Sequence, residues 1–211
     1  MTISKQMLKE IFITTASRYS GDSAIAAQLW AEIEKAYTAP QRHYHNLHHL
    51  QQVWQQLAAV KHEVKDWELL LFSLCYHDLV YDATRADNEE QSARLAADRL
   101  RSLSMPEDQV AQSAAHIMAT KGHHPSIDPD TNLFTDADLF ILGADWNTYL
   151  EYTKQIRQEY HHYSDEAYRQ GRKNVLQHFL RMPRIFKTAP FYEKYEKQAR
   201  ENLQKELQWL G

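Results

Sequence analysis

Apolar residues recur every three or four positions along almost the whole chain. This spacing places them on one face of an α-helix, whereas a half-buried β-strand needs strict alternation. It predicts helices at residues 4–19, 23–38, 47–60, 67–81, 88–103, 107–120, 145–161, 165–181 and 191–209. Alternating runs with hairpin dipeptides are missing. We therefore expect an all-α protein, a single helical bundle domain over residues 1–211 in which 145–211 form additional C-terminal helices.

Polar residues at the expected helix starts support these boundaries. Asp22, Asn46 and Asp66 each stand just before an apolar segment, where a side-chain oxygen can accept hydrogen bonds from the first free main-chain N–H groups. Asp87, with Glu90 three residues later, has the form of a capping box. Two segments, 39–46 and 121–132, are expected to be loops.

The composition limits the kind of protein this can be. The chain has 211 residues, of which 43% are hydrophobic, which is enough for a substantial core, and no apolar run approaches the roughly 18 residues of a membrane span. The N-terminal segment does not have the form of a secretory signal. A single cysteine, Cys75, excludes an internal disulfide and fits a reducing compartment. We expect a cytoplasmic protein with no membrane partner.

The charge adds little to this picture. The net charge is −4 and the chain has no long basic run, so dedicated nucleic-acid binding is not expected. The aromatic-rich last helix packs on the core or forms a homodimer contact, and the sequence leaves both open.

The side chains that could bind a metal ion are concentrated in residues 43–78. A histidine cluster, His43-Tyr44-His45-Asn46-Leu47-His48-His49, precedes an apolar stretch that ends in His77-Asp78. Imidazole and carboxylate groups are ligands that divalent first-row metals accept. Burying Asp78 without a cation would be costly, which favours a metal ion or a paired base beside it. His45 and His49 share a helical face only if the helix already includes residue 45; Asn46 as the N-cap would leave His45 outside it.

These stretches resemble the signature of the HD superfamily, and most closely its small predicted metal-dependent phosphohydrolases. The resembling segments are 42–50, 76–82, 87–93, 119–123 and 136–139. The resemblance implies that His49, His77, Asp78 and Asp138 hold a divalent ion. The Ala-Asp step and the Asp-x-x-x-Leu-Gly spacing favour Asp138 over its rival Asp136, and the metal-site motifs then fall within 42–143.

Other histidines compete for these roles. His45 and His48 are rivals of His49 for the first ligand position. By the resemblance, the histidines that stand between the His-Asp pair and the last aspartate could help to bind a second ion; they are His116, His123 and His124. The metal itself stays open among Mn, Mg, Fe, Co, Ni and Zn.

The resemblance implies a hydrolase in which a metal-activated water attacks phosphorus in a nucleotide or another small phosphorylated metabolite. Besides Asp78, we expect Glu89 to orient the water or protonate the leaving group, although acidic residues also favour first helical turns for structural reasons. Lys121 is the expected phosphate contact, with Arg42 and Arg85 as weaker candidates. The alternatives are an HD-type di-iron oxygenase and a non-catalytic nucleotide-binding protein.

Overall fold

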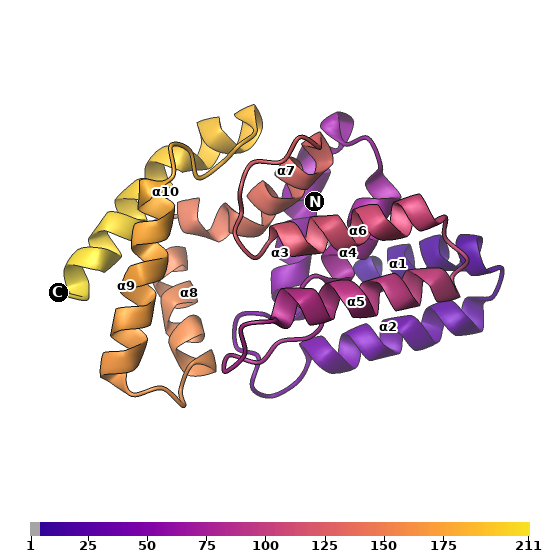
Figure 1. Ribbon diagram of the computed structural model, residues 1–211, viewed down its shortest axis with the longest axis horizontal. Helices are drawn as coiled ribbons and strands as arrows, with labels where there is room; N and C mark the ends of the chain where they lie inside the picture. The colour runs from indigo at the N-terminus through magenta and orange to yellow at the C-terminus, as the bar shows by residue number, and fades with distance from the viewer. Residues whose placement is uncertain (1–4) are drawn as a thin grey trace. The chain divides into compact units, whose positions relative to one another are not determined.

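The computed structural model describes residues 5–211, and these residues form helices and no β-strand (Figure 1). The all-α prediction is confirmed. The first residue of the helix predicted at 4–19 lies outside the described residues. None of the described helices is long and apolar enough to cross a membrane. The chain divides into two compact units, and the division falls between Thr135 and Asp136. The single domain over residues 1–211 stays a prediction.

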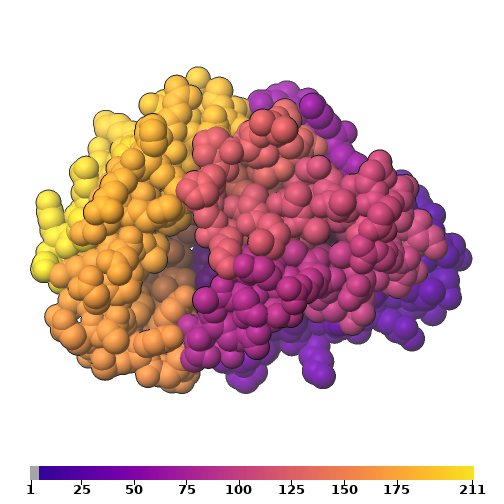
Figure 2. Space-filling model, in the orientation of Figure 1, coloured from indigo at the N-terminus to yellow at the C-terminus, as the bar shows by residue number. Residues whose placement is uncertain are grey.

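The first unit is built from six helices, a short 3₁₀ helix and the start of a seventh helix. They are α1 (Lys5–Ser20), α2 (Ser23–Tyr37), α3 (Leu47–Ala59), η1 (Lys61–Glu63), α4 (Trp67–Tyr76), α5 (Asn88–Ser102), α6 (Glu107–Ala119) and α7 (Pro129–Asp138). Helix α4 is the centre of this unit, with α1, α3, α5 and α6 packed around it. Figure 2 shows α5 and α6, in magenta to rose, on the visible face of this unit.

The composition of α4 explains its central place. Every residue from Leu69 to Tyr76 is buried, so the helix has no polar face to turn toward water. Aromatic contacts extend this core, because the ring centroid of Phe12 lies 5.6 Å from that of Trp30, in a tilted pair, and 5.6 Å from that of Phe72, in an edge-to-face pair. A helix buried on all sides fixes the position of the residues that follow its C-terminus, and these are His77 and Asp78.

The second unit contains η2 (Leu139–Gly143), α8 (Trp146–Glu159), α9 (Asp165–Arg181) and α10 (Ala189–Trp209). Helix α10 packs on η2 and α9. It approaches η2 so closely that a Cβ atom at Gly143 would lie 2.6 Å from the Cβ of Tyr195, so a side chain cannot be accommodated there. Asn202 of α10 completes the contact by donating hydrogen bonds to the carbonyl oxygens of Leu142 and Ala144.

A buried ion pair joins the three long helices of the second unit. Arg172 of α9 donates two hydrogen bonds to the carboxylate of Glu206 on α10, at 2.7 and 2.9 Å. The hydroxyl of Tyr149 on α8 donates to the same carboxylate. Both charged side chains are less than a tenth exposed. Because each charge has a partner, its burial is tolerated.

Most predicted helices are found within one or two residues of their expected ends, but two regions differ. Helix α4 ends at Tyr76, five residues before the predicted end at 81. The segment 129–138, part of which was expected to be a loop, is the helix α7. The capping box at Asp87 is also wrong, because the Asp87 carboxylate binds Arg85 and Gln91 instead of the helix N-terminus.

Candidate metal centre

The first turn of α3 buries His49. The side chain of Asn46 accepts hydrogen bonds from the main-chain N–H groups of His48 and His49, which confirms Asn46 as the N-cap. This start gives the three histidines different surroundings: His45 precedes the helix, with its Nε2 atom 4.0 Å from Oδ2 of Asp78, His48 is exposed, and His49 is 2% exposed. The structure therefore turns His49 into the unit and His48 out of it.

His77 and Asp78 follow directly after α4. His77 is 1% exposed, whereas the Asp78 side chain is 18% exposed. The Nε2 atom of His77 lies 3.0 Å from Oδ2 of Asp78 and 3.3 Å from Nε2 of His49. The His49 Nε2 atom is itself 3.8 Å from that carboxylate oxygen. The adjacent side chains of His77 and Asp78 and the distant imidazole of His49 thus converge on one point.

The other ring nitrogen of His77 determines what this point can bind. Its Nδ1 lies 2.8 Å from the carbonyl oxygen of Leu74, which can only accept, so Nδ1 carries a proton and donates it. In the neutral ring, Nε2 then presents a lone pair to the carboxylate oxygen of Asp78. Two acceptors 3.0 Å apart repel each other unless a proton or a cation lies between them. A backbone acceptor behind the ring is also the usual support of a metal-binding histidine.

Asp138 is the last residue of α7, a helix that begins within the first unit at Pro129. Single ligand atoms of His49, His77 and Asp138 lie within 4.8 Å of one another, so these three residues could hold a metal ion.

Asp136, the rival of Asp138, has a different task. Its carboxylate is fully buried and accepts hydrogen bonds from the main-chain N–H groups of Lys187 and Thr188, from the Thr188 hydroxyl and from the Lys187 ammonium. Within the second unit it therefore fixes the start of α10. A carboxylate engaged in this way is not available to a metal ion, which supports the order in which the two aspartates were ranked.

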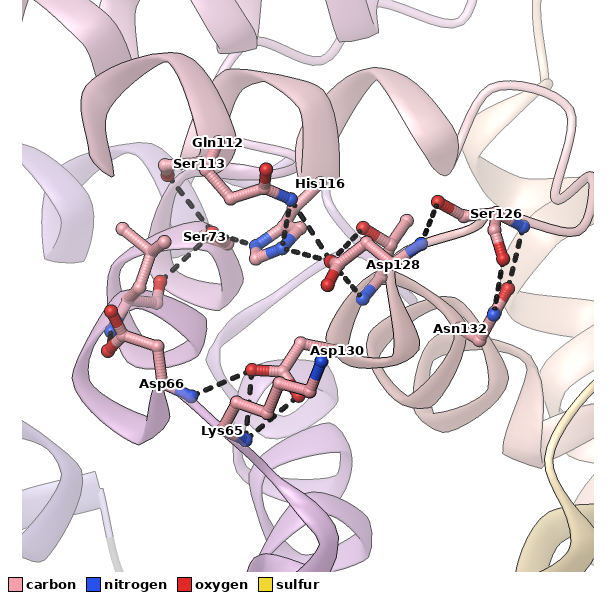
Figure 3. A network of polar contacts seen from close by, with 12 residues as sticks. Lys65, Asp66, Ser73, Gln112, Ser113, His116, Ser126, Asp128, Asp130 and Asn132 are labelled. Carbon is pink, nitrogen blue, oxygen red and sulfur yellow. Dashed lines mark hydrogen bonds and ion pairs between the residues drawn. The ribbon is translucent and has the colours of Figure 1, made fainter. Parts of the chain in front are cut away.

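His116 lies elsewhere in the first unit, in a network of polar side chains (Figure 3). Its Nδ1 is 3.1 Å from the Ser73 hydroxyl on α4, and its Nε2 is 3.2 Å from Oδ2 of Asp128, just before α7. The same Asp128 oxygen accepts from the main-chain N–H and the hydroxyl of Thr131. His116 is not part of the metal group of the described residues. The role of His116 as a ligand of a second ion stays a prediction.

The Ser73–His116–Asp128 arrangement has the residue types of a nucleophilic triad. Ser73 is completely buried, however, and its hydroxyl also contacts Ser113 and the carbonyl oxygen of Leu69. A substrate cannot reach it. The network instead connects α4, α6 and the start of α7, and Asp130 adds a second connection by accepting from the N–H groups of Lys65 and Asp66 (Figure 3).

The remaining predicted residues fall in different surroundings. Glu89 is half-buried in the first turn of α5, and burial, with a smaller contribution from the charge of Asp78, raises the pKa of its carboxyl group. The Lys121 ammonium binds the Glu90 carboxylate and donates to the carbonyl oxygen of Ala86. His123 has a left-handed backbone, with φ of 51°, in the loop after α6. The structure does not bring Lys121 or His123 into the metal group.

Arg42 was expected at most to contact phosphate, and the structure gives it another role. Its guanidinium is buried and donates to main-chain carbonyl oxygens, among them that of Asp78. The sequence carries no sign of this role, because the contact spans 36 positions. The start of α7, by contrast, had a readable signal in Asp128-Pro129, an N-cap residue followed by proline at the first helical position.

Comparisons with known proteins do not add to this picture. No protein-family model matches the chain, and neither the curated proteins nor the solved structures gave a match. The site is therefore interpreted from its own residues.

Proposed function

We propose that the chain is a metal-dependent phosphohydrolase that acts on a nucleotide or another small phosphorylated metabolite. The observation that supports this most strongly is the convergence of the His49 and His77 Nε2 atoms on the Asp78 carboxylate, with the His77 tautomer held by Leu74. Asp138 is the fourth ligand in the proposal. A divalent ion bound there would supply an activated water and neutralise charge on phosphoryl oxygens.

Each side chain has a part in this proposal. His49 and His77 are almost fully buried, so they present nitrogen lone pairs without competition from water. Asp78 is partly exposed, so in this proposal its carboxylate is the ligand that a substrate can reach. Burial raises the pKa of Glu89, which is the direction that suits a group that protonates a leaving oxygen. Lys121 would have to leave Glu90 before it could contact a phosphate.

The test is phosphate release from a panel of nucleotides and phosphorylated metabolites by protein reconstituted separately with each candidate metal. His49→Ala and His48→Ala form a matched pair, because the two histidines are adjacent on α3 but only His49 is buried. We expect turnover in the wild type and in His48→Ala, and its loss in His49→Ala and Asp78→Ala. Equal turnover in all four proteins would contradict the proposal.

Absence of turnover with every metal would also contradict it. Two irons per chain together with oxygen uptake would then identify an oxygenase, whereas nucleotide binding without turnover would identify a sensor.

A further inference from the structure

The segment after α4 does not continue the α-helical hydrogen bonds. Even so, every main-chain N–H and carbonyl group from residue 78 to residue 80 has a hydrogen-bond partner. The N–H of Leu79 donates to the carbonyl oxygen of Tyr76, as in a turn. The other partners are side chains from distant parts of the first unit. Buried main-chain groups need such partners, and a helix that stops leaves several without one.

Three side chains supply them. The hydroxyl of Tyr37, at the end of α2, accepts from the N–H of Asp78 at 3.1 Å. Ser92 of α5 binds both main-chain groups of Val80, at 3.1 and 3.2 Å. Arg42 donates to the carbonyl oxygens of Asp78 and Leu79, at 2.6 and 2.7 Å. The peptide groups on both sides of Asp78 are thus held by side chains.

Arg42 also reaches the other ligand segment. The nitrogen that binds the Asp78 carbonyl donates to the carbonyl oxygen of His45 at 3.1 Å, directly before the Asn46 cap of α3. The guanidinium lies over the rings of Tyr37 and Tyr81, at 4.8 and 5.4 Å from their centroids. Within the described chain, its contacts are thus with carbonyl oxygens and tyrosine rings. A buried arginine with these partners joins two main-chain segments.

We propose that Arg42 is a positioning residue of the metal centre, which together with Tyr37 holds the Asp78 main chain at a fixed distance from the α3 start that carries His49. This inference rests on the proposed metal site and adds residues that are not ligands. A planar guanidinium can donate to three carbonyl oxygens at once because its N–H groups form a rigid fork. A lysine in its place keeps the charge but loses the fork.

The experiment measures the affinity for Co²⁺ by titration and the visible absorption spectrum of the Co²⁺-loaded protein, in full-length wild type and in Arg42→Lys. Lysine is chosen because it preserves the positive charge beside the cation site, so that only the geometry changes. We expect Arg42→Lys to bind Co²⁺ about 10- to 100-fold more weakly, the usual effect of removing a supporting contact behind metal ligands. We also expect an altered absorption band.

Two further variants separate positioning from general loss of stability. Arg172→Lys disturbs a buried arginine of the second unit that does not touch Asp78, and it should leave the Co²⁺ affinity unchanged. Tyr37→Phe removes only the hydroxyl that accepts a hydrogen bond from the Asp78 N–H group, and it should weaken Co²⁺ binding. This variant serves as the test if Arg42→Lys does not fold.

The outcomes distinguish this inference from the proposed function. Wild-type protein that binds no Co²⁺ would overturn the metal centre. Wild-type protein that binds Co²⁺ while folded Arg42→Lys or Tyr37→Phe matches its affinity and spectrum would overturn the positioning role alone. An equal loss of affinity in Arg172→Lys would overturn it as well.

Discussion

Two aspartates two positions apart on α7 show how surroundings assign different roles to the same residue type. Asp136 is surrounded by four donors from the start of α10, whereas Asp138 belongs to the group of residues that could hold a metal ion. The sequence alone ranks them only by local resemblance. What separates them is the position of Lys187 and Thr188, about fifty residues later in the chain.

The first prediction concerns this pair. Asp136→Asn should lower the free energy of unfolding by about 3–5 kcal/mol, because it removes the carboxylate that is paired with the buried Lys187 ammonium. Asp138→Asn should cost little stability and should lower the metal content of the purified protein. Denaturant unfolding and elemental analysis of both variants test this. The assignment fails if Asp136→Asn loses the metal while its stability is unchanged.

The second prediction concerns Glu89. Its folded-state pKa is raised mainly by burial, so the folded protein holds this proton more tightly than the unfolded chain does. Ionisation of Glu89 therefore costs stability progressively as the pH rises above the ordinary value of 4.5. In metal-free protein, Glu89→Gln should become more stable relative to wild type between pH 4 and pH 8. Urea unfolding at both pH values measures this, and a stability difference that shrinks over this range would contradict it.

At the scale of the helices, periodicity was a good guide wherever one face is apolar. The N-caps at Asp22, Asn46 and Asp66 were readable because a cap acts on residues two or three positions away. The early end of α4 was not readable. The pattern of apolar residues continues past Tyr76, but Arg42 and Tyr37 bind the main chain there in a non-helical conformation. A local sequence pattern cannot show that side chains from distant positions bind the main chain and end the helix.

The third prediction belongs to the network that joins α4, α6 and α7. Burial lowers the pKa of His116, while the carboxylates of Asp128, Asp130 and Asp66 oppose this in part. The unfolded chain then binds the proton more readily, so the stabilising effect of neutral His116 is present above pH 6.5 and is lost as the pH falls below it.

Wild-type protein should accordingly lose more unfolding free energy than His116→Gln between pH 7.5 and pH 5.5. Urea titrations across this range measure the two slopes, and equal slopes would show that His116 does not titrate differently on folding. Metal content should be the same in both proteins, since His116 is outside the metal group.

At the scale of the whole chain, the predicted motifs and the compact units do not coincide. The motifs span 42–143, whereas the first unit ends at Thr135, inside α7. Composition and periodicity showed that the chain is all-α and has a core. They could not show where the units divide, because that depends on which helices pack together. The candidate metal ligands were named by resemblance, whereas the side chains that hold the main chain beside them were not predicted.

The fourth prediction is that metal ions stabilise the folded chain. An ion that binds only the folded state raises the free energy of unfolding by about 2.7 kcal/mol at a hundred times its dissociation constant. Thermal denaturation with and without chelator should show this shift in wild type and in His48→Ala, and its loss in Asp78→Ala. A shift of equal size in Asp78→Ala would place the ion elsewhere.

The way residues 78–80 are held has a consequence for the state without metal. Their N–H groups are bound by Tyr37, by the Tyr76 carbonyl and by Ser92, none of which depends on an ion. Amide hydrogens in this non-helical segment should therefore exchange with solvent as slowly as those of a buried helix, and should do so in apo protein. The ligands would then wait in place for the ion, and the chain would not have to order a loop each time it is loaded.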